Sequence, residues 1–263
     1  MRVRLLFLAG ALSLGIAGSA QAAGAPTPPA QKWSFDGLFG TYDRAALQRG
    51  FQIYKEVCSA CHAMNQIRFR DLGGGPGGAH APLIGLGFTE DEVKAIAAET
   101  KVMDGPNDQG EMFERAARPA DRFKKPFPNE QAARAANNGA YPLDLSLIID
   151  ARKNGPDYVY GLMTGYKDAP AGMQMSDGMH YNEWFAGHQI AMVKPLDDDR
   201  VTYSDGTKAT VPQMAKDVVT FLAWASEPNM EHRKALGVKV ILFLVLLSGL
   251  LYAVKRKVWA DLH

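Results

Sequence analysis

The sequence contains very little cysteine: Cys58 and Cys61 are the two in 263 residues. Two cysteines so close together cannot form a disulfide framework that would hold the whole fold together. The sequence also lacks a charge excess, because 29 basic and 28 acidic residues leave a net charge of +1. A nucleic-acid partner would require a basic excess, so we expect none. With 47% apolar and 22% charged residues, the composition is ordinary for a globular chain and does not indicate disorder.

Long apolar runs are confined to the two ends of the sequence. Residues 1–22 have the features of a secretory signal, because Arg2 and Arg4 precede an apolar run from Leu5 to Ala17. Ala20-Gln21-Ala22 supplies small residues for a cleavage site. The run is too short to span a bilayer comfortably, so we expect cleavage there and not an N-terminal anchor.

The second run, Ala235 to Val254, has 20 residues and is interrupted only by Lys239 and by Ser248-Gly249. At about 1.5 Å per residue, a helix of this length crosses the roughly 30 Å core of a bilayer. A buried helix of a globular domain would show one polar face, and this run has none. Lys255-Arg256-Lys257 follows directly, and such positive charge marks the cytoplasmic side. We therefore expect a transmembrane helix.

These two runs predict how the chain is organised. Residues 1–22 are the signal peptide, 23–233 an exported domain, 235–254 the membrane anchor and 255–263 a cytoplasmic tail. In a bacterium, this is a single-pass protein of the inner membrane with its domain in the periplasm.

The segment between the runs predicts helices joined by long irregular loops. Periodic apolar residues, N-caps and turn residues place helices at 43–57, 89–99, 144–153, 158–164 and 212–226, and two short strands around 201–203 and 209–211. The proline-containing segment 119–138 should follow the surface, and the glycine-rich stretch Gly73 to Gly78 has no assigned role. The predicted fold class is therefore mainly α.

Cys58-Ser59-Ala60-Cys61-His62 carries the chemistry. Two thiols separated by two residues match the spacing of the haem vinyl groups, and the adjacent histidine then presents an imidazole nitrogen to the iron. A thioredoxin-like motif would follow a strand, whereas a helix is expected here before Cys58. A zinc site would need a second cysteine or histidine pair, which the sequence lacks. We therefore predict one covalently attached haem c.

The sixth iron ligand decides between electron transfer and ligand chemistry, since a methionine there raises the potential and blocks access to the iron. Met64 is too close to the cysteines to cross the ring, and Met214 lies on the apolar stripe of a helix. The remaining candidates are Met163, Met173, Met175, Met179 and Met192, with His180 and His188 as rivals. Spacing alone does not choose among them.

Further motifs cover nearly all of the chain after the expected signal. In chain order they are Arg49 to Tyr54 running into Cys58-Ser59-Ala60-Cys61-His62, Asp104-Gly105-Pro106-Asn107, Gly110-Glu111-Met112-Phe113, Ala132 to Ala140, Asp157-Tyr158-Val159-Tyr160, Leu162 to Tyr166, Ala215 to Leu222 and Glu227-Pro228. This combination resembles the cytochrome c1 family, the haem subunits of the ubiquinol–cytochrome c oxidoreductase (cytochrome bc1) complex.

The resemblance implies a set of site residues. The family's axial methionine matches Met192, and its arginine and tyrosine near the haem propionates match Arg152 and Tyr158. A forked guanidinium suits a carboxylate partner. The sequence departs from the family where two prolines are often found, because Pro142 is followed by Leu143. If a backbone carbonyl there orients the imidazole of His62, Leu143 can still supply it.

The resemblance further implies a class I cytochrome c-like domain that is not an enzyme on its own. It implies a respiratory or photosynthetic complex with cytochrome b, in which this haem takes electrons from the Rieske iron–sulfur protein and passes them to a soluble cytochrome c. The alternative is a membrane-anchored haem enzyme or gas sensor with an exchangeable sixth ligand. Between Gly85 and Arg115, eight acids against three bases leave a local net charge of −5, which suits steering of a basic partner.

Overall fold

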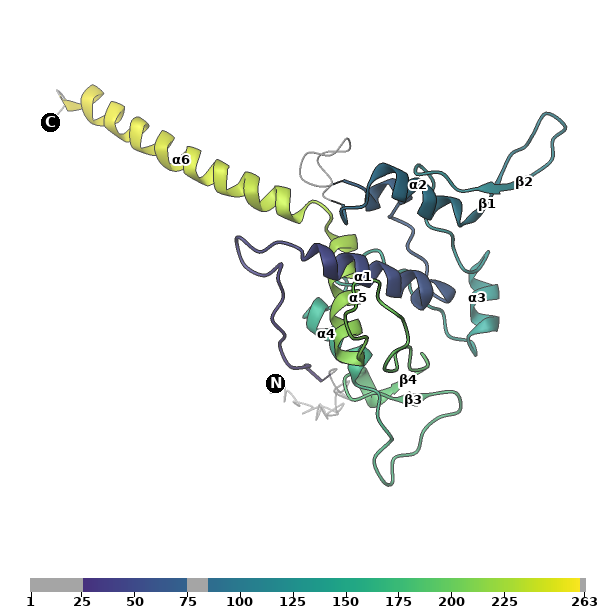
Figure 1. Cartoon of the computed structure of the whole chain (residues 1–263). Coiled ribbons are helices and arrows are strands. Elements are labelled where there is room, and N and C mark those ends of the chain that lie inside the picture. The colour runs from purple at the N-terminus through teal and green to yellow at the C-terminus, as the bar shows by residue number, and fades with distance from the viewer. Residues whose placement is uncertain (1–25, 75–84, 261–263) are drawn as a thin grey trace, which may run out of the picture.

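The computed structural model describes residues 26–74 and 85–260, and this part of the chain is mainly helical (Figure 1). The helical class predicted from the sequence is therefore confirmed. The expected signal peptide 1–22 lies outside the described residues, as do the last four glycine-stretch positions, 75–78. Two small two-stranded sheets are the regular β structure in the described ranges.

Helices α1 (Arg44–Glu56) and α5 (Val211–Ser226) begin within one residue of the starts that Asp43 and Pro212 predict. The Asp43 carboxylate accepts hydrogen bonds from the backbone N–H groups of Ala45 and Ala46, at 2.9 and 3.1 Å. Thr210 caps α5 through the N–H of Gln213. These side chains satisfy donors that a helix N-terminus leaves unpaired, and the sequence prediction is confirmed for both helices.

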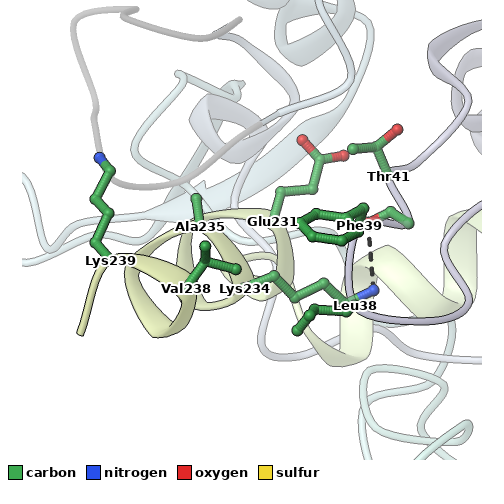
Figure 2. Close-up of a pocket in the computed structure, with 9 residues that line it drawn as sticks. Leu38, Phe39, Thr41, Glu231, Lys234, Ala235, Val238 and Lys239 are labelled. Atoms are coloured by element: carbon green, nitrogen blue, oxygen red, sulfur yellow. Dashed lines mark hydrogen bonds between the residues drawn. The ribbon is translucent and has the colours of Figure 1, made fainter. Parts of the chain in front are cut away.

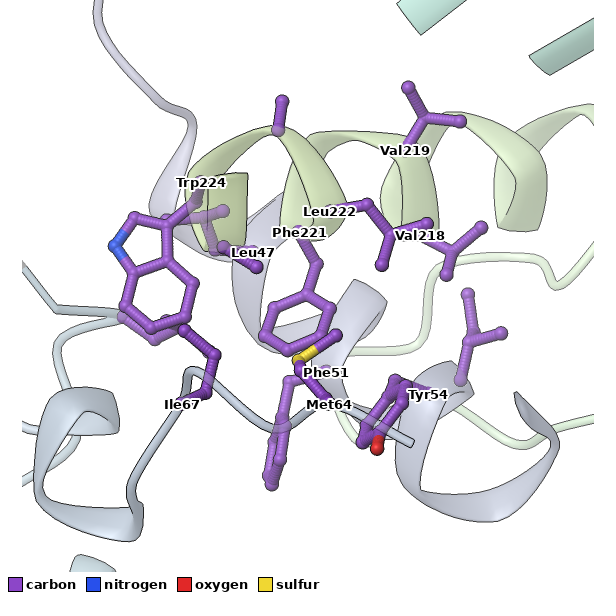
Figure 3. Packing of buried hydrophobic residues seen from close by; sticks show 14 of the residues in the cluster. Leu47, Phe51, Tyr54, Met64, Ile67, Val218, Val219, Phe221, Leu222 and Trp224 are labelled. Carbon is purple, nitrogen blue, oxygen red and sulfur yellow. The ribbon is translucent and has the colours of Figure 1, made fainter. Parts of the chain in front are cut away.

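The core of the domain lies between α1 and α5, with α4 (Gly155–Thr164) packed on α5. The two helices approach closely at Gly50, where an added Cβ would lie 2.1 Å from the Asp217 carbonyl oxygen. Glycine is therefore required there for the helix spacing. Figure 3 shows apolar side chains of both helices meeting, and Phe51 and Phe221 have ring centroids 5.8 Å apart.

A buried ion pair joins the same two helices. Asp217 lies on α5 with its side chain 1% exposed, and its carboxylate accepts two hydrogen bonds from the Arg49 guanidinium, both at 2.9 Å. Arg49 also pairs with Asp205 at 2.8 Å and lies over the ring of Tyr203. These hydrogen bonds raise the pKa of Arg49 above its ordinary value, so the guanidinium stays charged against α5.

Helix α2 (Glu90–Ala98) starts with the capping box that the sequence predicts, since Thr89 and Glu92 bond to each other's backbone N–H. A hairpin follows, in which β1 (Lys101–Asp104) pairs antiparallel with β2 (Phe113–Ala116). Sequence reasoning missed this hairpin, and it also missed α3 (Glu130–Ala136) within the segment expected to follow the surface.

One predicted helix and two predicted strands are wrong. Residues 144–153 form turns and not a helix, because the backbone N–H of Leu145 donates to the carbonyl of Ala63 and the N–H of Ser146 to the Asp144 carboxylate. Residues 201–203 and 209–211 form no strands. Their buried side chains produce the apolar alternation, but the carbonyl of Thr202 accepts from the Gln52 side chain. In both segments, backbone groups form hydrogen bonds with partners other than those of the predicted helix or strands.

Beyond α4, a short antiparallel pair encloses an irregular segment. Strand β3 (His180–Tyr181) pairs with β4 (Gln189–Ile190), and a single 3₁₀ turn, η3 (Ala186–His188), connects them. Two further 3₁₀ turns, η1 (Cys58–Ala60) and η2 (Phe69–Leu72), follow α1. The long loops expected from the sequence are therefore present and carry few regular hydrogen bonds.

The last helix, α6 (Met230–Val258), has 29 residues and projects away from the domain (Figure 1). Its most apolar window has a mean hydropathy of 2.3, and none of that window is buried. Length and exposure fit a membrane anchor over the predicted 235–254. The helix begins before the apolar run, so domain and anchor are joined by one continuous helix.

Candidate haem site

The segment Cys58–His62 leaves α1 through a tight 3₁₀ turn. The N–H of Val57 still bonds to the Ile53 carbonyl, at 2.9 Å, and the N–H groups of Cys61 and His62 both donate to the Cys58 carbonyl, at 3.1 and 2.9 Å. One carbonyl therefore fixes the positions of both cysteines and of the histidine. Because a helix and not a strand precedes the motif, the thioredoxin-like alternative does not fit.

Neither thiol is in a disulfide. Cys58 packs against the hydrophobic core, and burial, with a smaller contribution from Cys61, raises the pKa of its thiol to about 12. Cys61 is exposed. Among the described residues, no three His, Cys, Asp or Glu side chains cluster to hold a metal ion, which removes the zinc alternative for this part of the chain.

The two ring nitrogens of His62 have separate roles. Nδ1 lies 2.7 Å from the carbonyl oxygen of Leu143, which can only accept, so Nδ1 carries the proton. Nε2 is then the unprotonated nitrogen, available as a metal ligand. Burial lowers the pKa of His62, against the opposing effects of the Leu143 bond and of Asp144. The imidazole is therefore neutral at neutral pH, as an iron ligand must be.

Hydrogen bonds from the segment after His62 hold Leu143 in place. The N–H of Asn65 donates to the Asp144 carboxylate at 2.9 Å, and the N–H of Gln66 donates to the Ser146 hydroxyl at 3.0 Å. Sequence reasoning did not identify Asp144 or Ser146 as site residues. The sequence pointed to Asp144 and Ser146 only through their position just after Pro142-Leu143.

Exposed apolar side chains lie on the chain segments that carry Leu143 and Met192. Tyr141, Leu143 and Leu147 lie on the segment that contacts His62, and Val193 directly follows Met192. Such side chains are costly in water unless they have a partner. Two free thiols, one neutral imidazole nitrogen and exposed apolar side chains on the segment that contacts His62 together fit a covalently attached porphyrin.

Arg152 and Tyr158 lie near each other. The charge of Arg152 lowers the pKa of Tyr158 against the larger raising effect of burial. The Arg152 guanidinium donates to the carbonyl of Ala151, and no carboxylate pairs with it among the described residues. A cation beside a half-buried phenol, with donors still available, fits a carboxylate of the bound group.

Met192 lies two residues after the end of β4 and is half-buried. Its backbone carbonyl accepts a hydrogen bond from the Tyr166 hydroxyl at 2.9 Å, a contact that the sequence did not predict. Within residues 26–74 and 85–260, no hydrogen bond joins Met192 to the segment Cys58–His62. The structure thus anchors the backbone of Met192, and its role as ligand stays a prediction.

The other candidate ligands divide into core and loop positions. Met64 is fully buried in the core (Figure 3), Met214 is fully buried there as expected, and Met163 packs against it from α4. The half-buried residues Met173, Met175 and Met179 lie in the loop before β3. His180 is exposed, and the ring of His188 stacks on Tyr181 with centroids 5.7 Å apart.

The family model and the relatives found by comparison with known proteins agree on one family. The model of the cytochrome C1 family matches residues 33–262. A cytochrome b/c1 from Bradyrhizobium diazoefficiens is 49% identical over 98% of this chain, which covers 39% of that longer protein. A mitochondrial cytochrome c1 heme protein from Arabidopsis thaliana is 51% identical over 89% of this chain and 73% of its own length.

A third relative, the mitochondrial catalytic subunit of the cytochrome b-c1 complex from Candida albicans, is 48% identical over 89% of this chain and 78% of its own length. The family model spans nearly all of the described domain and the terminal helix. The chain belongs to the cytochrome c1 family.

Proposed function

We propose that this chain is the haem-carrying, electron-transfer subunit of a cytochrome bc1 complex, with Cys58 and Cys61 as the attachment points. The main observation in support is the imidazole of His62, whose Nδ1 is hydrogen-bonded to the Leu143 carbonyl. Its Nε2 is left as the available ligand atom, next in sequence to two cysteines that form no disulfide. When bound, haem c supplies one-electron chemistry at its iron. The chain is not an enzyme by itself, because it supplies binding and orientation to that group.

His62 and Met192 are the two proposed iron ligands. The bond to Leu143 keeps the imidazole in one tautomer and one orientation, which raises its basicity as a ligand. On the other side, the Tyr166 hydroxyl holds the backbone of Met192. A thioether ligand raises the reduction potential and keeps small molecules from the iron, as an electron relay requires.

Arg152 and Tyr158 are the proposed partners of the haem propionates. Buried carboxylates need a charged or hydroxyl donor, and Arg152 has donors that no carboxylate of the described residues uses. Replacing Arg152 by Gln should lower the reduction potential, because an unscreened propionate stabilises the oxidised iron. Arg233, an exposed arginine of α6 that pairs with Glu227, offers a matched control for replacement by Gln.

The proposed electron donor is the Rieske iron–sulfur protein, and the proposed acceptor is a soluble cytochrome c, with cytochrome b as neighbour in the membrane. Support comes from the family and from the names of the relatives, which include a cytochrome b/c1 and a cytochrome b-c1 complex subunit. The acid-rich region 85–115, with α2 exposed at its start, is the proposed docking surface for the acceptor.

The proposed orientation places the haem domain in the periplasm of a bacterium and the C-terminus in the cytoplasm. Lys255-Arg256-Lys257 in the last turn of α6 support it, since positive charge flanks the cytoplasmic end of membrane helices. The same charges complement the helix dipole at that end. The expected signal peptide at 1–22 agrees with export of the domain.

Carbon monoxide binding and electron relay test the proposal together. The purified holoprotein, reduced and then exposed to carbon monoxide, should keep its spectrum, and oxidised soluble cytochrome c should reoxidise it. A spectral shift with carbon monoxide would favour a haem enzyme or gas sensor with an exchangeable ligand. Failure to reduce any soluble cytochrome c, without that shift, would contradict the relay.

A further inference from the structure

A cavity of about 290 Å³ lies where α6 leaves the haem domain (Figure 2). One wall is the loop Leu38–Thr41, and the other is the first part of α6, from Glu231 to Lys239. Most of its lining is apolar, through Leu38, Phe39, Ala235 and Val238. The proposed haem site uses none of these residues.

The loop presents its apolar side chains to the outside. Phe39 is 79% exposed, the highest value among the large hydrophobic side chains of the described residues, and Leu38 is 57% exposed. The adjacent backbone is nevertheless held firmly, because the Lys234 ammonium donates to the carbonyls of Phe35 and Gly40, at 2.6 and 3.2 Å. Exposing the apolar side chains at this loop tip, Leu38 and Phe39, to water is unfavourable, and contact with an apolar partner would remove that cost.

The contacts of the loop tip with α6 determine where it lies relative to a membrane that α6 would span. The loop meets α6 where the apolar run begins, at Ala235 and Val238, and from there the helix is exposed over its whole membrane-length window. If α6 spans a bilayer, Phe39 lies at the level of the lipid interface. The tip would then meet acyl chains and not bulk water.

The charges around the cavity are already paired, with one exception. Glu231 accepts from the Tyr42 N–H and from Arg44, both at 2.7 Å, and Lys234 is bound to the two carbonyls. Lys239 has no ion pair or hydrogen bond within the described ranges, and Figure 2 shows its ammonium extended away from the other labelled side chains. The cavity thus combines an apolar wall with one available cation.

We propose that this cavity is an interfacial lipid site. The acyl chain of an anionic phospholipid, from the leaflet next to the haem domain, lies between Phe39 and α6, and its phosphate pairs with Lys239. The lipid would fix the angle at which α6 leaves the domain. The proposal depends on α6 spanning a membrane and is independent of the haem.

Photocrosslinking tests the apolar half of this site. The full-length holoprotein, with benzoylphenylalanine in place of Phe39, is reconstituted in vesicles of equal phosphatidylcholine and phosphatidylglycerol, irradiated and analysed by mass spectrometry. We expect lipid adducts at position 39 and none when the same group replaces Phe113, an exposed phenylalanine on β2. Adducts to a second copy of the chain, or yields equal to those at position 113, would overturn the proposal.

Replacement of Lys239 tests the headgroup. In the same vesicles, Lys239→Gln should lower the ratio of phosphatidylglycerol to phosphatidylcholine adducts about fivefold, the effect of one surface lysine on anionic lipid. Lys255→Gln, at the opposite end of α6, is the matched control and should leave the ratio unchanged. An unchanged ratio in Lys239→Gln would overturn the pairing with the phosphate. The haem spectrum should be the same in every variant.

Discussion

At the residue scale, the surroundings of His62 divide the roles of its two ring nitrogens. The carbonyl of Leu143 accepts a hydrogen bond from Nδ1–H, so Nε2 is the nitrogen left for the proposed iron. The family often has proline where this chain has Leu143, yet the bond needs only a backbone carbonyl. The N–H groups of Asn65 and Gln66 donate to the side chains of Asp144 and Ser146, just after Leu143. These bonds supply the rigidity that a second proline would give.

Met192→Leu should leave the haem covalently attached, lower its reduction potential sharply and open the iron to carbon monoxide. Leucine keeps the volume but offers no lone pair to the iron. Redox titration and a carbon monoxide difference spectrum of the purified variant measure both effects. Met175→Leu, another half-buried loop methionine, is the control. A native potential and spectrum in Met192→Leu would show that another residue is the ligand.

The site residues differ in how far the sequence alone could predict them. Cys58, Cys61 and His62 follow from local spacing, because thioether attachment constrains consecutive residues. Met192 needed the family resemblance, since a ligand from a distant loop has no spacing rule. The carbonyl of Leu143 has no side-chain signature, so only the fold brings it to His62.

At the element scale, the packing of α1 against α5 depends on the buried ion pair between Arg49 and Asp217. Arg49→Met should lower the free energy of unfolding by about 3–5 kcal/mol, because it leaves the Asp217 carboxylate buried without its cation. Chemical denaturation of the holoprotein followed by circular dichroism measures this. Lys94→Met, which removes only exposed pairs with Glu90 and Asp91, should change stability by about 1 kcal/mol or less. Equal losses in both variants would contradict the ion pair's role.

The hairpin β1–β2 is tied to the domain through Asp121. Its carboxylate accepts from both terminal nitrogens of Arg115, at 2.6 and 3.1 Å, and these bonds lower the pKa of Asp121 to about 2. The folded pKa lies below the unfolded value of about 3.9, so Asp121 stabilises the fold above that pH. The contribution is lost as the pH falls from about 4 to 2.

Melting temperatures measured between pH 5 and pH 2 test this dependence. Asp121→Asn should melt lower than the unaltered protein at pH 5, and the gap should close as the pH falls. Glu114→Gln, on the exposed face of β2, serves as control and should show no such convergence. A gap that stays constant down to pH 2 would rule out the Asp121 carboxylate as the titrating group.

Local signals predicted several helices but not every local element, because the hairpin β1–β2 and α3 were missed. Asp43 and Thr89 each mark a helix start because an N-cap acts within its own turn. The failed helix at 144–153 has equally good apolar periodicity. Its first residues bond instead to the segment after His62, far away in the sequence: the N–H of Leu145 donates to the Ala63 carbonyl, and the Asp144 carboxylate accepts from the N–H of Asn65.

At the scale of the whole molecule, negative charge gathers on α2 and the hairpin. The structure changes how this surface should be tested, because Glu92 closes the capping box of α2 and its replacement would unwind the helix start. Glu90 and Asp91 are exposed, and their ion pairs within the described residues are those with Lys94. Reversing their charge removes only exposed pairs and leaves the capping box in place.

Glu90→Lys combined with Asp91→Lys should slow cytochrome c reduction about tenfold at low ionic strength, because steering depends on the sign of the field. The slope of the rate against salt should also become shallower. Stopped-flow absorbance with soluble cytochrome c measures both quantities. Asp197→Lys with Asp199→Lys, exposed acids before α5, provides the control. An unchanged rate and salt slope would remove α2 from the docking surface.

The proposed layout makes the haem a relay between two protein partners outside the membrane, with α6 holding it at the surface. This account depends on covalent attachment at Cys58 and Cys61. Acid–acetone extraction followed by a pyridine haemochrome spectrum tests that claim most directly. We predict that haem stays with the full-length protein, gives a c-type spectrum, and is lost in Cys58→Ser/Cys61→Ser. Haem that is extracted from the unaltered protein, or retained in the double variant, would contradict it.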